Sequence, residues 1–122
     1  MKVLSRKETG RIAEEKAKEH LVKLGYEILH VNWHFGHLEL DIVAKDNNQL
    51  VVVEVKSRTG IRYEHPSEAV TDQKIRYIVE AAEAYIYEYD VKEDTRFDVI
   101  TVIFLDGNIE LEHFVDAFYP MP

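Results

Sequence analysis

Hydrophobic positions near the start of the chain recur with the 3.6-residue period of a helix. The apolar stripe consists of Ile12, Ala13, Ala17, Leu21 and Leu24. Ser5 followed by Glu8 matches a capping box, in which each residue satisfies the backbone N–H of the other. Gly25 follows the stripe and suits the end of a helix. The pattern predicts a first helix from about residue 5 to residue 24.

Short apolar segments bounded by turn residues predict five strands. They are expected over about residues 26–33, 38–45, 50–57, 97–105 and 109–114. A second helix is expected over about 66–87, with a break near Thr71, and it crosses between the third and fourth strands. Such a crossover makes these two strands parallel, whereas the first three form an antiparallel meander. The order αβββαβ, with a final short strand, predicts an α/β fold whose mixed central sheet is flanked by helices.

The segment between the second and third predicted strands is a hairpin signal. Asn47 and Asn48 suit the two central positions of a tight turn, because asparagine tolerates positive φ. Paired positions then sum to 95, which places Asp41 opposite Glu54 and Glu39 opposite Lys56. The opposite face is wholly apolar and is expected to join the core, with Leu40, Ile42, Ala44, Val51, Val53 and Val55 on it.

Two carboxylates held face to face need a cation or a proton. At about 5 Å and an effective dielectric of about 20, Asp41 and Glu54 would repel by roughly 3 kcal/mol. A raised pKa, a cationic side chain or a divalent metal would relieve this repulsion, and Mg²⁺ suits carboxylate oxygens and waters. Lys56 lies on the same face and could hold an attacking water or offset charge on a phosphate. The alternative is an exposed sheet face on which Glu39 and Lys56 form an ordinary ion pair.

Length, composition and charge set limits on this interpretation. The 122 residues fit one domain, 1–122, and the absence of cysteine excludes disulfides and thiolate zinc sites. The N-terminus has no apolar signal-peptide core, and no apolar run approaches the roughly 20 residues that span a membrane. These features lead us to expect a cytoplasmic protein without a membrane partner. The net charge of -8 argues against nucleic acid as a partner, although a metal site itself concentrates carboxylates.

Asp41 followed by Glu54-Val55-Lys56 resembles the signature of PD-(D/E)xK nucleases. A wider set of segments resembles the YraN-like family, a widespread bacterial family of predicted endonucleases that is distantly similar to archaeal Holliday-junction resolvases. These segments are Gly10 to Glu14, Gly25-Tyr26, Asn32-Trp33, Glu39-Leu40-Asp41, Val53-Glu54-Val55-Lys56-Ser57-Arg58, Lys74 and Arg96-Phe97-Asp98. The chain departs from that family at Ala13 and Leu38, where glycine is frequent, and at His34, where arginine is common.

The resemblance implies a restriction-endonuclease-like fold and assigns roles to particular residues. Asp41 and Glu54 would bind Mg²⁺ or Mn²⁺ together with the backbone carbonyl of Val55. Lys56 would be the catalytic lysine, and Glu14 would correspond to the helical glutamate of resolvase-like nucleases. The implied activity is hydrolysis of phosphodiester bonds in DNA, including branched recombination intermediates. A homodimer is expected for a junction enzyme, because a four-way junction has two-fold symmetry.

Three further cations are candidates for phosphate contacts. Arg58 and Arg62 follow the third strand in a polar stretch, and Lys74 opens the second helix beside its apolar face. A solvated loop is the alternative for both arginines. Other functions also stay open, namely RNA as the substrate, or a nucleic-acid-binding or adaptor domain that keeps a nuclease fold with little or no turnover. A scaffold that uses the aromatic second helix is a further alternative.

Overall fold

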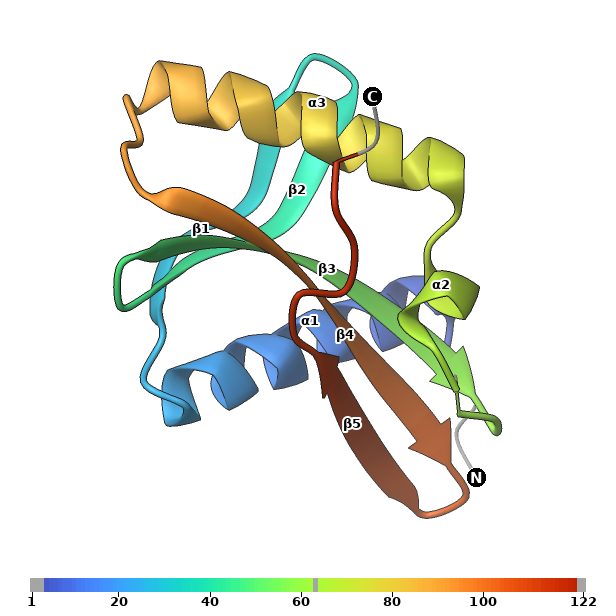
Figure 1. Cartoon of the computed structure of the whole chain (residues 1–122). Helices are drawn as coiled ribbons and strands as arrows, with labels where there is room; N and C mark the ends of the chain where they lie inside the picture. The colour runs from blue at the N-terminus through green and yellow to red at the C-terminus, as the bar shows by residue number, and fades with distance from the viewer. Residues whose placement is uncertain (1–3, 63, 121–122) are drawn as a thin grey trace.

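Five strands form one mixed sheet whose spatial order, β1-β2-β3-β4-β5, follows the chain. The structure is a computed structural model that describes residues 4–62 and 64–120. Its helices lie on opposite faces of the sheet, with α1 on one side and α3 on the other (Figure 1). In chain order the elements are α1 (Arg6–Lys23), β1 (Glu27–Phe35), β2 (Leu38–Asp46), β3 (Gln49–Thr59), α2 (Pro66–Ala69), α3 (Asp72–Glu88), β4 (Asp94–Leu105) and β5 (Asn108–Phe114).

The strand directions confirm the predicted mixed sheet flanked by helices. β1, β2 and β3 form an antiparallel meander, β3 and β4 are parallel, and β5 runs antiparallel to β4. β4 begins at Asp94, three residues before the predicted start at 97, because its pairing with β3 extends back to Gln49. The predicted break at Thr71 separates α2 from α3. The Thr71 hydroxyl caps α3 by accepting a hydrogen bond of 3.2 Å from the backbone N–H of Lys74.

The first helix forms as predicted and fixes one wall of the fold. Ser5 and Glu8 make the reciprocal hydrogen bonds of a capping box, and Gly25 leaves the helix with a φ of 91°. Ala13, Ala17 and Leu21 are buried against the sheet. Leu24, which was expected in this stripe, is instead 53% exposed because it lies at the C-cap, beyond the last helical turn.

Both faces of the β2–β3 hairpin are buried near the turn. The expected apolar face packs against α1 through Ile42, Ala44, Val51 and Val53. The other face packs against α3, and its core includes Val43 and Val52. Leu40 was expected beside Ile42, but it belongs to the α3-side cluster. The strict alternation of faces along β2 is therefore broken between these two residues, at Asp41.

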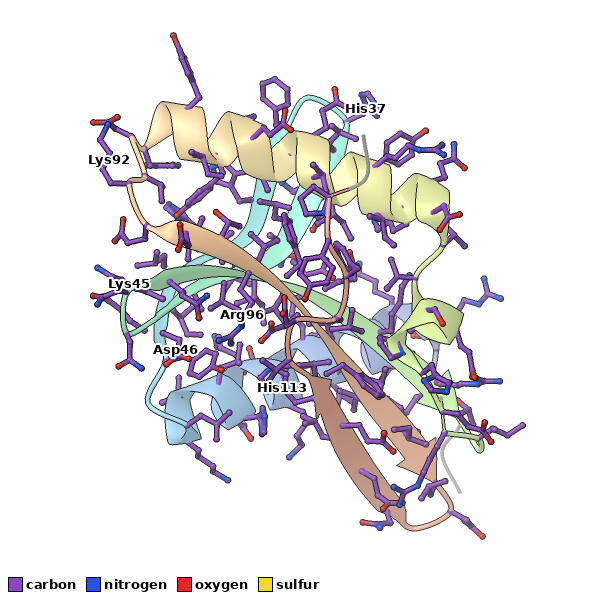
Figure 2. The ribbon with its side chains drawn as sticks, viewed as in Figure 1. His37, Lys45, Asp46, Lys92, Arg96 and His113 are labelled. Atoms are coloured by element: carbon purple, nitrogen blue, oxygen red, sulfur yellow. The ribbon has the colours of Figure 1, made fainter. Side chains whose placement is uncertain are left out.

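A buried polar network centred on Arg96 and Asp98 of β4 connects β4 to residues of β2 and β5. The Asp98 side chain is fully buried, and both of its oxygens accept hydrogen bonds of 2.9 Å from the Arg96 guanidinium. His113 of β5 lies 2.7 Å from Asp98, and Arg96 also donates to Asp46 in the β2–β3 turn at 3.2 Å. Figure 2 shows Arg96 beside Asp46, with His113 below it on β5. The network joins both hairpins to the parallel strand pair.

No helix within residues 4–62 and 64–120 combines the length and the apolar character that crossing a lipid bilayer requires.

Candidate functional site

The predicted register of the β2–β3 hairpin is confirmed up to the edge of the candidate site. Partners from Asp46 and Gln49 to Ile42 and Val53 each sum to 95. Within the described residues the pairing of β2 with β3 ends there, while β3 continues beside β4 to Thr59. Asp41 and Glu54 are thus the first residues beyond the paired region. The two strands diverge at the point where the carboxylates lie.

Asp41 occupies the gap that this divergence opens. Its Oδ2 accepts a hydrogen bond of 2.8 Å from the backbone N–H of Val55, in place of a main-chain partner. The N–H and carbonyl of one strand residue point to the same side of the strand. The Val55 carbonyl therefore also points toward β2, into the opening beside Asp41. The carbonyl that the family resemblance names as a metal ligand thus points to the same side of β3 as the N–H that Asp41 accepts.

Glu54 is a buried carboxyl in contact with Asp41. It is only 5% exposed, and it lies on the α3-facing side of β3. Burial, together with the hydrogen bond and the charge of Asp41, raises the pKa of Glu54 to about 9, although Lys74 and Lys56 act in the opposite direction. The conflict predicted from the sequence, two carboxyl groups without room to be charged together, is therefore present.

Glu14 of α1 approaches the same point from the opposite face of the sheet. Burial and the nearby Asp41 carboxylate raise the pKa of Glu14, and the side chain of Asn32 lowers it by hydrogen bonding. Its Oε1 atom is buried without a hydrogen-bond partner among the described residues. The structure therefore brings Glu14 close to Asp41.

Asn32 of β1 is a part of this site that we did not select from the sequence. Its neighbours Val31 and Trp33 pair with Ile42 and Leu40, so Asn32 faces Asp41 across the β1–β2 pair. Asn32 has a left-handed φ of 52°, a conformation that asparagine tolerates better than most residues. This irregularity coincides with the broken alternation of β2. Asn32 stands out in the sequence only as part of the Asn32-Trp33 segment that resembles the YraN-like family, and an asparagine within a strand is by itself too common to identify a site residue.

The structure separates the candidate cations into two groups. Lys56 and Lys74 both lie close enough to Glu54 to favour its charged form, which places one lysine on β3 and another at the start of α3 beside the carboxylates. Arg62 lies apart from them, with its guanidinium in ion pairs to Glu110 and to Glu112 of β5. Arg58 is half-buried on β3 in register with Ile103.

The donor set fits a hard divalent cation that keeps part of its water shell. Within residues 4–62 and 64–120, no group of three or more histidine, aspartate or glutamate side chains is arranged to hold a metal ion. Two carboxylates and one backbone carbonyl leave the remaining positions to waters. Mg²⁺ is commonly bound in this way, through one or two carboxylates and several waters. The oxygen-only chemistry of Asp41, Glu54 and Val55 suits Mg²⁺ or Mn²⁺ better than a transition metal that prefers sulfur or nitrogen.

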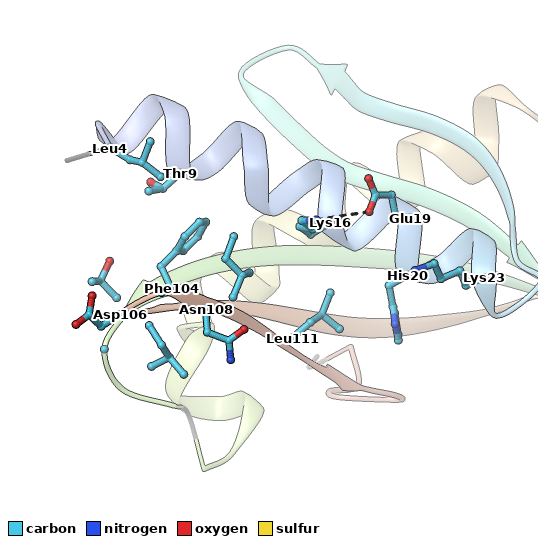
Figure 3. Close-up of a pocket in the computed structure, with 15 residues that line it drawn as sticks. Leu4, Thr9, Lys16, Glu19, His20, Lys23, Phe104, Asp106, Asn108 and Leu111 are labelled. Carbon is cyan, nitrogen blue, oxygen red and sulfur yellow. Dashed lines mark ion pairs between the residues drawn. The ribbon is translucent and has the colours of Figure 1, made fainter. Parts of the chain in front are cut away.

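A surface groove lies elsewhere, between α1 and the β4–β5 turn. Its walls include Lys16, His20, Phe104 and Leu111, and Figure 3 shows these side chains with Asn108 at the turn. None of the carboxylates or lysines described above lines it. The groove and the candidate site are therefore separate features.

The fold and the site together define an α/β protein whose mixed sheet carries a buried carboxyl pair where two strands diverge. Comparison with known sequences then gives the family. The model of the uncharacterised protein family UPF0102 matches residues 13–102, and the chain belongs to this family. A UPF0102 protein of Phocaeicola vulgatus is 45% identical over 113 residues, which is 93% of each chain. Another, from Bacteroides fragilis, is 48% identical over 111 residues, or 91% of this chain and 92% of the relative.

Proposed function

We propose that this protein is a metal-dependent endonuclease of the PD-(D/E)xK superfamily with a restriction-endonuclease-like fold, as in the YraN-like family of predicted nucleases. The observation that carries the proposal is the burial of Glu54 against Asp41 with two lysines nearby. An arrangement of this kind destabilises a metal-free fold, and such conflicts are typical of functional sites. A divalent cation between the carboxylates would relieve it.

Each residue of the site has a role in this proposal. Asp41, Glu54 and the Val55 carbonyl would hold Mg²⁺ or Mn²⁺, and Glu14 would complete the acidic environment from α1. When bound, the metal supplies a Lewis acid and lowers the pKa of its water. The Lys56 ammonium would offset the negative charge that develops on the phosphate. Lys74, at the N-terminal end of α3, would add positive charge on the side where the phosphate enters.

The proposed substrate is DNA, with branched recombination intermediates among the structures to test. Arg58 would contact the phosphate backbone from the end of β3. Arg62 would have to exchange Glu110 and Glu112 for a phosphate before it could contribute. A cytoplasmic location and a homodimer on two-fold symmetric junctions belong to the same proposal.

Cleavage assays with a matched pair of variants test the proposal. Linear, nicked and four-way DNA, together with single-stranded RNA, would be incubated with the protein in Mn²⁺ or in chelator. We expect Mn²⁺-dependent DNA cleavage by the wild type and its loss in Asp41→Asn, whose amide oxygen can still accept the Val55 N–H. Glu15→Gln is the control and should cleave normally, because Glu15 is exposed and pairs with Lys18 instead. Absence of cleavage of every substrate by the wild type would contradict the proposal.

A second candidate is a nucleic-acid-binding or adaptor domain without turnover. The net charge of -8 favours it, because a protein that binds DNA by itself usually presents an excess of cations. The exposed aromatic residues Phe35 and Tyr87, which are 50% and 91% exposed, offer a surface for a protein partner. Binding of four-way DNA without cleavage in the same assays would support this alternative.

A further inference from the structure

Thr101 is a buried polar residue of β4 that has no role in the site described so far. Its side chain is 0% exposed, and its Oγ1 has no hydrogen-bond partner among the described residues. Its neighbours Ile100 and Val102 are fully buried and apolar. A buried hydroxyl without a partner opposes folding, and valine would fill nearly the same volume without that cost. The hydroxyl therefore calls for an explanation other than packing.

The neighbouring polar residue of the same strand shows the contrast. Asp98 is also fully buried, but it accepts hydrogen bonds from Arg96, from His113 and from the backbone N–H of Asp116. Its burial is thus compensated by partners that join three parts of the chain. No comparable partner surrounds the Thr101 hydroxyl, so the network around Asp98 does not account for it.

The sheet places Thr101 in one row with two charged residues. In register, Thr101 pairs with Lys56 on β3 and with Glu112 on β5. Aligned residues on adjacent strands present their side chains on the same face of the sheet. Figure 1 shows β3, β4 and β5 side by side. The row continues to Arg62, whose guanidinium donates to Glu112 at 3.1 Å.

We infer that Thr101 is a positioning residue whose hydroxyl holds the Lys56 ammonium on the β4 side of the Asp41–Glu54 pair. A threonine hydroxyl can accept from an ammonium while it donates to a carboxylate, and Thr101 lies between Lys56 and Glu112. The long, flexible lysine side chain reaches the hydroxyl by rotation about its own bonds. The catalytic importance of this contact rests on the proposed nuclease function.

Holding the Lys56 ammonium toward β4 would keep it from competing with a metal ion for the carboxylates. Lys56 lies near Glu54 and favours its charged form, so an unrestrained ammonium would pair with the carboxylates and compete with a metal ion. An ammonium held toward β4 leaves Asp41 and Glu54 free to bind a metal ion, and the ammonium can still interact with a phosphate. Because β3 lies between β2 and β4 in the sheet, Thr101 is on the β4 side of β3 and Asp41 is on its β2 side.

The test uses Thr101→Val, which keeps the shape, and Thr101→Ser, which keeps the hydroxyl. The first readout is independent of turnover: the ¹⁵N–¹H NMR signal of the Lys56 ammonium in the metal-free protein, assigned by its loss in Lys56→Arg. We expect a sharp signal in the wild type and in Thr101→Ser, and a shifted, rapidly exchanging signal in Thr101→Val. Glu110→Gln is the control, because Glu110 also pairs with Arg62 but lies opposite Ile103. It should leave the Lys56 signal unchanged.

The second readout is kinetic and is compared with stability. In Mn²⁺-dependent cleavage, Thr101→Val should lower kcat by about tenfold at nearly constant KM, as expected for a misplaced catalytic group. Thr101→Ser should restore kcat. The melting temperature of Thr101→Val should stay close to that of the wild type, because valine keeps the shape, and removal of a buried hydroxyl offsets the lost contact with the Lys56 ammonium.

The outcomes separate this inference from the proposed function. An identical Lys56 signal in wild type and Thr101→Val would overturn the inference, as would a wild-type kcat in Thr101→Val. A lower melting temperature for Thr101→Val than for Thr101→Ser would assign the hydroxyl a structural role and would also overturn it. If the signal changes as expected but the wild type cleaves nothing, the Thr101–Lys56 contact stands and the nuclease proposal fails.

Discussion

Replacing Asp98 with asparagine is the perturbation whose effect the structure defines most sharply. The Asp98 side chain is fully buried, and the Arg96 side chain beside it is only 10% exposed. Asparagine keeps the shape and one acceptor, but it turns an NH₂ group toward donors of Arg96 or His113 and removes the charge that compensates the guanidinium. Breaking a buried ion pair from one side costs about 3–5 kcal/mol. Because one oxygen remains, we expect Asp98→Asn to lower the free energy of unfolding by about 3 kcal/mol.

Urea unfolding followed by circular dichroism measures this loss. Asp46→Asn is the matched control, since Asp46 also pairs with Arg96 but its side chain is 26% exposed. A partly exposed pair contributes little, so this variant should lose less than about 1 kcal/mol. The reasoning is refuted if Asp98→Asn loses no more than Asp46→Asn.

Three further predictions concern Asp98, Tyr85 and Lys56. Burial would raise the pKa of Asp98, but hydrogen bonds from His113, Arg96 and the Asp116 backbone outweigh it and lower that pKa below 3.8. The stability that this carboxylate contributes is therefore complete above pH 3.8 and is lost as the pH falls through the depressed pKa. The difference in free energy of unfolding between the wild type and Asp98→Asn, measured by urea unfolding, should therefore decrease as the pH is lowered below 3.8. Tyr85→Phe removes a 2.7 Å hydrogen bond to His30 from a side chain that is 2% exposed, and thermal unfolding should show a loss of about 1 kcal/mol; an unchanged melting temperature would contradict this. Lys56→Met should abolish cleavage while calorimetry still detects Mn²⁺ binding, and full activity in this variant would exclude the lysine role.

The hairpin shows how far the sequence alone can predict this site. Asn47 and Asn48 determine the turn, and the turn determines the register, so the approach of Asp41 to Glu54 followed from local chemistry. The end of the pairing at Ile42 and Val53 could not be predicted, because it depends on β3 following β4 while β2 follows β1. The same divergence moved Leu40 to the α3 side of the core.

Contacts between distant segments account for what the sequence left open. Glu14 reaches Asp41 only because α1 packs across the sheet, a contact that the periodicity of the helix does not specify. Asn32 faces Asp41 through an irregular strand pair. The pairing of Lys56 with Thr101 depends on a parallel register that no local turn specifies, whereas Thr101 and Glu112 pair within the antiparallel β4–β5 hairpin.

Mn²⁺ titration by calorimetry tests the central claim most directly, which is that Asp41 and Glu54 form a divalent-metal site. We predict saturable Mn²⁺ binding to the wild type and to the Glu15→Gln control, and its loss in both Asp41→Asn and Glu54→Gln, with all four proteins folded by circular dichroism. Absence of Mn²⁺ binding to the wild type, or equal binding to all four proteins, would contradict the account.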